Sequence, residues 1–246
     1  MPLHVRAVNT ASDSENKIHD DSVAAAYGFR GGLVPGVTVY GYMASAVIDH
    51  LGREWLNRGA MDVRFQHPVY EGDDVEVAVE PESDGRIRVF IADRATATAW
   101  IGDHPHPTTI PYAPLARRKA SRESLMPGTV LGAWTERLDL AQSTISAPLD
   151  SSIDGHAHPA VLLALANRIF VENYELGPWI HVSSEVRKFR AVKDGENIQV
   201  HAQIADAYEK KGHEFVVLDA VLDGVLGGIS DPIEYIRHTA IWRPRQ

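Results

Sequence analysis

The sequence contains no cysteine. This absence excludes disulfides, thiolate metal sites and a cysteine nucleophile. Basic side chains are in the minority, 24 against 33 acidic ones, and the net charge of −9 argues against broad nucleic-acid binding while leaving room for a local basic patch. No apolar run approaches the roughly 20 residues that span a bilayer, and the first residues lack the apolar region of a signal peptide. We therefore expect a soluble cytoplasmic protein.

The first half of the chain has one apolar block followed by alternating segments. Residues 37–57 begin apolar or small on nearly every face, which is typical of a helix buried on all sides. Apolar and polar residues then alternate at 61–66 and again at 75–79, on either side of the turn sequence YEGDD, as on half-buried strands. Two further strands are expected at 86–92 and 96–102.

The second half repeats this plan at a constant distance. Three landmarks recur 123 residues later: the helix start at 37 and 160, the dipeptide VR at 63 and 186, and the turn segment at 69 and 192. A shared offset of half the chain predicts tandem domains of one fold, at 1–103 and 125–246, joined by a Pro-rich polar linker at 104–124. Each domain is expected to be α+β, with a curved antiparallel sheet wrapped around its buried helix.

A motif precedes the first helix. N-K-I-H-x-D contains Asn16, His19 and Asp21, and A-x-x-x-G-F-R-G-G-L-V-P-G follows it, with Phe29 and Gly36 in register. This pattern resembles that of the MaoC-like, (R)-specific enoyl-CoA hydratase family, and the whole chain is similar to the double form of its hot-dog fold. The resemblance implies hydration or dehydration of an acyl-CoA or acyl-carrier-protein thioester, with no cofactor and no metal; the fold leaves a homodimer possible.

The resemblance also implies roles for particular residues. His19 would be the acid or base and Asn16 a positioning residue, because one group must take a proton from water while a donor protonates carbon. The backbone amides of Gly36 and Val37, at the start of the helix, would hold the thioester oxygen. Arg30 and Gly31 are further candidates for substrate binding.

Two departures from the family pattern keep other functions open. Ser14 stands at the family's aspartate position and is no general base at neutral pH; the flanking Asp13 or Glu15 would replace it only in a remodelled loop. Pro35 stands where the family has a histidine. The alternatives are an acyl-CoA thioesterase, with water held by His19, Glu15 or Asn167, and a non-catalytic acyl-thioester binding or structural protein.

Several other side chains have two readings each. Asp13 or Ser14 would cap a short helix that Gly28 closes, if the motif segment were only a turn. Asn167 is either a core amide or a residue that positions water. The pair His156-x-His158 either binds a metal or caps the second helix and lines its pocket. His181, Ser183 and Glu185 alternate on one strand face, which either approaches the same pocket or faces solvent, and we favour solvent. The basic candidates are either surface charges, which is the expectation for each one singly, or contacts for the phosphates of the carrier: Arg30, Arg58, Arg64, Arg187, Lys188 and Arg190.

Overall fold

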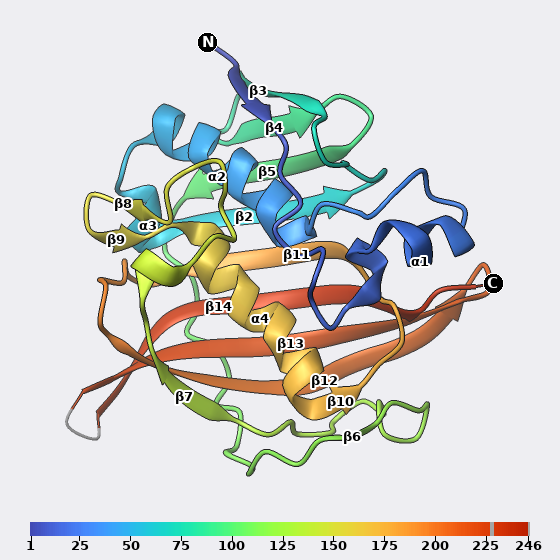
Figure 1. Cartoon of the computed structure of the whole chain (residues 1–246). Helices are drawn as coiled ribbons and strands as arrows, with labels where there is room; N and C mark the ends of the chain where they lie inside the picture. Colours follow the sequence, from blue (N-terminus) through green and yellow to red (C-terminus); the bar gives the residue numbers. More distant parts are fainter. Residues whose placement is uncertain (227–228, 246) are drawn as a thin grey trace.

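Ten strands form one antiparallel sheet, and two long helices cover one of its faces (Figure 1). The computed structural model describes residues 1–226 and 229–245. The strand order is β1-β3-β4-β5-β2-β11-β14-β13-β12-β7. The bounds of these strands are β1 Leu3–Arg6, β2 Gly59–Phe65, β3 Asp74–Pro81, β4 Ile87–Ile91, β5 Ala95–Ile101, β7 Trp134–Arg137, β11 Ile180–Lys188, β12 Asn197–Lys210, β13 His213–Leu226 and β14 Ile229–Arg243.

The two halves of the sheet repeat one topology about a pseudo-twofold axis. The first five strands mirror the last five in order, and β2 pairs with β11 at the junction. Asp62 lies opposite Glu185, its counterpart 123 residues later, so the pairing register itself obeys the repeat. The double fold predicted from the sequence offset is therefore confirmed.

The apolar blocks form helices α2, Gly36–Leu51, and α4, Pro159–Asn173. The two helices cross closely at Gly41 of α2 and Ala160 of α4. A Cβ added at Gly41 would lie only 2.9 Å from the Cβ of Ala160, so the absence of a side chain at Gly41 permits this approach. The predicted helix at 37–57 is interrupted because Gly52 adopts a positive φ of 79°, after which the short α3, Trp55–Arg58, leads into β2. Both helices pack against the sheet, and α2 is hydrophobic on nearly every face because it also packs against α4.

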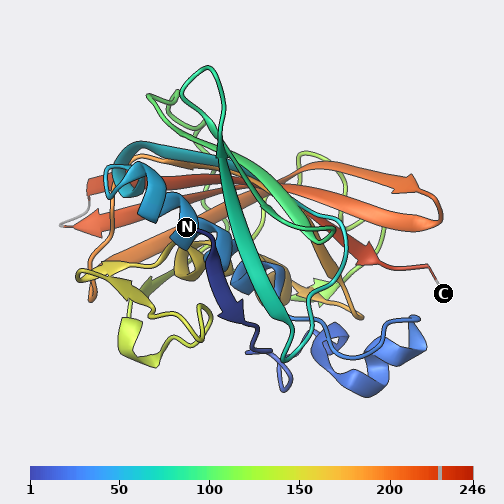
Figure 2. The same ribbon diagram turned by 90° about the horizontal axis from the view of Figure 1, so that it is seen from above.

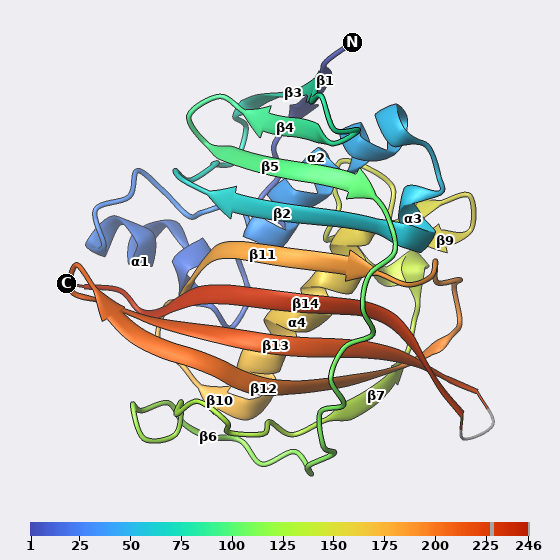
Figure 3. The same ribbon diagram turned by 180° about the vertical axis from the view of Figure 1, so that it is seen from behind.

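The segment between the halves crosses the face of the sheet opposite the helices (Figure 3). Ile110 is buried there, and the ring of His106 stacks on Phe189 with centroids 5.4 Å apart. Further on, β6, Arg118–Lys119, pairs in parallel with β10, Tyr174–Glu175, which follows α4. These contacts fasten the crossing segment to the second half of the chain.

The short elements gather at two places. The 3-10 helix η1, Lys17–His19, and α1, Asp21–Ala26, lie at the end of the sheet where the β12–β13 hairpin turns (Figures 1 and 2). The 3-10 helix η2, Leu140–Gln142, and the hairpin of β8, Ser152–Ile153, and β9, His156–Ala157, precede α4. The first group carries the sequence motif and lies against strands of the second half.

Candidate functional site

His19 is held at the end of a tightly folded loop. The side chain of Asn16 caps η1 by accepting from the backbone N–H of Ile18, whose own side chain is buried. The chain then returns, and the N–H of Leu33 donates to the carbonyl of Ile18 at 3.2 Å. A Cβ at Gly32 would collide with the carbonyl oxygen of His19, so only glycine fits this return.

The short helices of this loop are capped by residues other than Asp13 and Ser14. Asp20 caps α1 by accepting from the N–H of Val23, and Asn16 caps η1. Asp13 and Ser14 are therefore not the capping residues. Gly28, at a positive φ of 83°, follows the end of α1, as the alternative of a simple turn predicted.

The hydrogen bonds of His19 define its tautomer. Nδ1 lies 2.7 Å from the carbonyl oxygen of Leu33, which only accepts, so Nδ1 carries the proton. Nε2 is left with a lone pair, toward which the Asn16 amide donates at 3.3 Å. Burial lowers the pKa of His19, and the bond to Leu33 only partly offsets this effect. At neutral pH the imidazole is consequently neutral and basic at Nε2.

Asn16 also joins the two halves of the chain. Its Oδ1 accepts from the backbone N–H of Trp179 at 3.1 Å, and its Nδ2 donates to the carbonyl of the same residue at 3.0 Å. The side chain is buried, so both bonds are shielded from water. The position of His19 therefore depends, through Asn16, on a strand-entry segment that lies 163 residues after Asn16 in the sequence.

Two cavities meet at this histidine. The strand-side cavity, of about 550 Å³, lies among the ends of β2, β11 and β14, the β12–β13 hairpin and the motif loop. The helix-side cavity, of about 590 Å³, lies between α4 and the segments 11–16 and 136–145. Both cavities are lined by Asn16, His19, Asn167 and Trp179. These four side chains form the wall between the two spaces.

The amino end of α2 reaches the same wall. Gly36 lines the strand-side cavity and Val37 the helix-side cavity. Backbone N–H groups in the first turn of a helix have no intrahelical acceptor and carry the positive end of the helix dipole. Neighbouring amides at this end can thus stabilise negative charge on an oxygen that forms beside His19.

A buried cluster of His181, Ser184 and His238 packs against Gly36. A Cβ at Gly36 would lie only 2.6 Å from Nδ1 of His181. Nε2 of His181 lies 2.9 Å from the hydroxyl of Ser184, which in turn lies 3.0 Å from Nδ1 of His238. Burial lowers the pKa of His238 to about 3, and burial together with His238 lowers that of His181 well below its usual range. The cluster is therefore neutral at physiological pH.

The expectation that His181 faces solvent is wrong. A β-bulge between His181 and Ser183 shifts the alternation of β11, so that His181 joins Ser184 on the buried face. Glu185 is exposed, as expected, and Ser183 is half-buried. Simple alternation cannot reveal such a bulge. The less favoured reading, in which this row approaches the pocket, holds for His181 and Ser183, which both line the strand-side cavity.

The loop before Asn16 supplies no free carboxylate to His19. Ser14 lines the helix-side cavity and donates to the carbonyl of Asn16 at 3.2 Å. Glu15 lines the same cavity and forms an ion pair with Arg117. Asp13 is exposed and lines neither cavity. The structure thus brings Ser14 and Glu15, but not Asp13, to the helix-side entrance.

The remaining candidates divide between the site and the rest of the molecule. Arg30 pairs with Asp73 and stacks over Tyr70 at 4.2 Å, and Gly31 lies beside Asp21; neither lines a cavity. Arg64 does line the strand-side cavity. The other basic candidates are held in ion pairs away from both cavities: Arg58 with Asp103, Arg187 with Asp62, Arg190 with Asp231, and Lys188, fully buried, with Glu234.

His158 has a structural role at α4. Its Nδ1 accepts from the N–H of Ala160, and its Nε2 lies 2.9 Å from the Ser45 hydroxyl. His156 points elsewhere, with Nδ1 near the carbonyl of Asp154. Across residues 1–226 and 229–245, no three acidic or histidine side chains group as metal ligands. Within the same part of the chain, no helix is long and apolar enough to cross a membrane.

Comparisons with known proteins give a family match for the first part of the chain and a fold for the whole chain. Residues 9–100 match the family described as MaoC like domain, and no curated protein matches the sequence. A conserved protein of Mycobacterium tuberculosis with a double hot-dog fold is similar in structure, with 14% identity, a TM-score of 0.60, and coverage of 97% of this chain and 93% of that chain. The dehydratase domain of RzxB from Pseudomonas fluorescens is also similar in structure, with 12% identity, a TM-score of 0.58, and coverage of 97% of this chain and 93% of that chain.

A third structure, named as an oleoyl thioesterase from Lactobacillus plantarum, is 12% identical, with a TM-score of 0.57 and coverage of 100% of this chain and 96% of that chain. Proteins with different activities thus share this architecture, and at such identities the likeness shows the double hot-dog fold alone.

Proposed function

Because the chain carries a MaoC-like dehydratase domain within a double hot-dog fold, we propose that it adds water to, or removes water from, an enoyl or 3-hydroxyacyl thioester at His19. One observation carries this proposal. The neutral His19 has its basic Nε2 in the wall shared by two cavities, which Gly36 and Val37 at the amino end of α2 also line.

The proposed reaction uses one histidine for both proton transfers. In hydration, Nε2 of His19 takes a proton from water while the water oxygen bonds to C3, and the electrons of the double bond move onto the thioester oxygen. The amides of Gly36 and Val37 stabilise that oxygen. The imidazolium then returns the proton to C2. All atoms of the water end in the product, so the step balances without a carboxylate at position 14.

Asn16 positions this base in the proposed mechanism. Its bonds to Trp179 fix its amide, and its Nδ2 lies 3.3 Å from Nε2 of His19. Water must displace this weak contact or share it. The neighbouring Ser14 hydroxyl, which bonds to the Asn16 carbonyl, holds the loop rather than the water.

A thioesterase is the second candidate, and Asn167 is the observation that favours it. This residue, on α4, lines both cavities, and its Oδ1 is buried without a hydrogen-bond partner among the described residues. An unpaired buried acceptor is costly, and a water bound there would satisfy it. Such a water would attack the thioester carbon and release a free thiol instead of adding to C3.

The two reactions are separated by one assay. Crotonyl-CoA is incubated with the protein while enoyl absorbance and free thiol are followed together. Loss of absorbance without thiol is expected, and His19→Gln should abolish it, whereas His50→Gln, the same change at the exposed far end of α2, should not. Release of thiol favours the thioesterase, and binding of the thioester without either reaction favours a non-catalytic protein.

A further inference from the structure

The wall between the two cavities contains two polar atoms that the protein leaves unpaired. Oδ1 of Asn167 and Nε1 of Trp179 are both buried, and neither has a hydrogen-bond partner within residues 1–226 and 229–245. The Trp179 side chain belongs to the core, with only 4% of the residue exposed. One atom is an acceptor and the other a donor, and an unsatisfied buried atom of either kind costs free energy. Such a pair indicates a partner that does not come from the chain itself.

Both side chains come from the second half of the chain and lie at the same helix. Asn167 is on α4, and the ring of Trp179 packs against Phe170, three residues further along α4, with ring centroids 5.1 Å apart. Asn167 and Trp179 both line the two cavities, as His19 does. The backbone of Trp179 is fixed by its bonds of 3.0 and 3.1 Å to Asn16. The unpaired donor and acceptor thus belong to the same wall as the basic Nε2 of His19.

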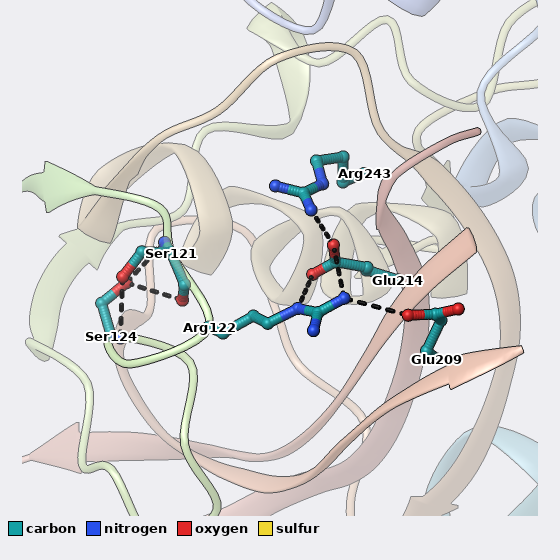
Figure 4. Close-up of polar contacts among 6 residues, drawn as sticks. All are labelled: Ser121, Arg122, Ser124, Glu209, Glu214 and Arg243. Carbon is teal, nitrogen blue, oxygen red and sulfur yellow. Dashed lines mark hydrogen bonds and ion pairs between the residues drawn. The ribbon is translucent and has the colours of Figure 1, made fainter. Parts of the chain in front are cut away.

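Carboxylates around the site are engaged by guanidinium groups. Glu15, at the helix-side entrance, pairs with Arg117. Glu214 lies on β13 between two residues that line the strand-side cavity. Arg122 donates to Glu214 at 3.1 and 3.2 Å, and Arg243 pairs with the same carboxylate (Figure 4). Neither carboxylate is therefore free to hold a reacting water.

A single water molecule would complement the three groups of this wall. Water donates two hydrogen bonds and accepts two, and a buried water typically makes about three. It can donate to Nε2 of His19 and to Oδ1 of Asn167, and it can accept from Nε1 of Trp179, which only donates. One lone pair of the water oxygen then remains free for a carbon atom of the substrate.

We propose that Asn167 and Trp179 hold the water that reacts at His19, in place of the carboxylate that is absent at position 14. This inference rests on the proposed function and names the side chains that orient its water. Nε2 of His19 takes one proton while the free lone pair bonds to C3. The second hydrogen stays on that oxygen as the product hydroxyl, bonded to Oδ1 of Asn167, and the imidazolium returns its proton to C2. The same water would serve hydrolysis if the thioester carbon, rather than C3, lay beside it.

Nuclear magnetic resonance of the ligand-free protein tests this site without turnover. The protein is labelled with nitrogen-15, and the indole signal of Trp179 is identified by its loss in Trp179→Phe. A rotating-frame cross-relaxation peak is expected between this indole proton and water. It should fall severalfold in Asn167→Leu, because the water loses an acceptor. Asn57→Leu, which removes an amide that bonds to the Ala191 N–H away from both cavities, should keep the peak.

Steady-state hydration of crotonyl-CoA gives the second readout. Asn167→Leu keeps the shape of the side chain, and Trp179→Phe keeps a ring against Phe170 and the backbone bonds to Asn16. Each variant should lower kcat about tenfold or more and leave KM within about twofold, because it misplaces the water and not the thioester. The double variant should lose less than the product of the two single effects, since both act on one water. Trp100→Phe, on β5 and away from both cavities, is the matched control.

No water peak in the wild type, or an equal peak in Asn167→Leu, would overturn the proposal. So would an equal fall in kcat with Asp139→Asn, which would give the role to an exposed carboxylate of the helix-side cavity. Hydration that responds to neither Asn167→Leu nor Trp179→Phe would keep the proposed function and remove the water site. A water peak that behaves as expected in a protein that leaves crotonyl-CoA intact would contradict the proposed hydration and keep the water site.

Discussion

His19 combines a motif position with a protonation state that only the structure defines. The sequence motif indicates the residue and its acid–base role, but not which ring nitrogen is free. The bond from Nδ1 to the Leu33 carbonyl makes Nε2 the base, and burial keeps it neutral. This state matters because a base must be unprotonated when it takes a proton from the attacking water.

The pH dependence of activity should follow from this burial. Because the pKa of His19 is lowered, the group loses its base function only below the usual histidine range. We expect kcat/KM for crotonyl-CoA to be level around neutral pH and to fall on acidification, with its midpoint below about 6.5. A pH–rate profile measures this limb. A midpoint clearly above that value would contradict a buried neutral base.

Replacement of Asn16 by aspartate should move that limb upward. A carboxylate 3.3 Å from Nε2 favours the imidazolium and so raises the pKa of His19. Asn16→Asp also replaces the amide N–H that donates to the Trp179 carbonyl with a carboxylate oxygen, which only accepts. The loss of this hydrogen bond should lower the free energy of unfolding by about 1–3 kcal/mol. The pH–rate profile and a urea titration measure the two effects.

Asn57→Asp is the matched control, because the Asn57 side chain also bonds to the second half, at the Ala191 N–H, but away from the cavities. It should leave the acid limb unchanged. An unshifted limb in Asn16→Asp would mean that this amide does not sense the protonation of His19.

At the scale of elements, the amino end of α2 depends on a close contact with the second half. Gly36→Ala would press a Cβ against His181, which is held by Ser184 and cannot move without disturbing His238. We expect a loss of about 1–3 kcal/mol in the free energy of unfolding and a fall in kcat from the displaced helix end. Thermal melts and steady-state assays measure both.

Gly177→Ala is the control for this prediction, because a Cβ there meets no atom within 4 Å. It should leave stability and activity close to those of the wild type. If Gly36→Ala had the same stability and activity as Gly177→Ala, the contact with His181 would not constrain the amino end of α2.

The elements themselves were largely predictable, and their exceptions have physical causes. Apolar runs located α2 and α4, and two-residue alternation located β2 to β5, while β1, β7, β13 and β14 were not located individually. The bulge in β11 was not predictable, because an extra residue leaves no mark in composition, and it buries His181. The bond between Asn16 and Trp179 was equally hidden, since only the folded chain brings them together.

For the whole molecule, buried neutral histidines link stability to pH. Burial, followed by the charge of Lys188, lowers the pKa of His158 to about 4, and burial lowers that of His238 to about 3. The unfolded chain binds these protons near pH 6.5 and the folded chain does not. The contribution of each group is therefore complete above pH 6.5 and is lost as the pH falls toward its folded pKa.

Denaturant titrations between pH 6 and 4 should show this loss. Each histidine contributes a slope of about 1.4 kcal/mol per pH unit while it is protonated only in the unfolded chain. His238→Gln should reduce the total slope by about that amount, and His50→Gln, an exposed residue, should not. Equal slopes in the wild type and His238→Gln would contradict a buried, uncharged His238.

The repeat explains why the overall fold was accessible from the sequence and the site only partly so. The constant offset of 123 residues predicted two equivalent halves, and the register of β2 with β11 follows it. The site does not follow the repeat: where the first half has Pro35 and Gly36, the second has His158 and Pro159, and His158 is closed off by Ser45. The motif, present in one half, located His19 but not its partners from the other.

Isotope incorporation tests hydration at His19 most directly. Crotonyl-CoA is incubated with the protein in water enriched in oxygen-18, and the products are analysed by mass spectrometry. The account predicts an intact 3-hydroxybutyryl thioester with the label on C3, and no label incorporated with His19→Gln. Label in a released carboxylate, or unchanged incorporation with His19→Gln, would contradict it.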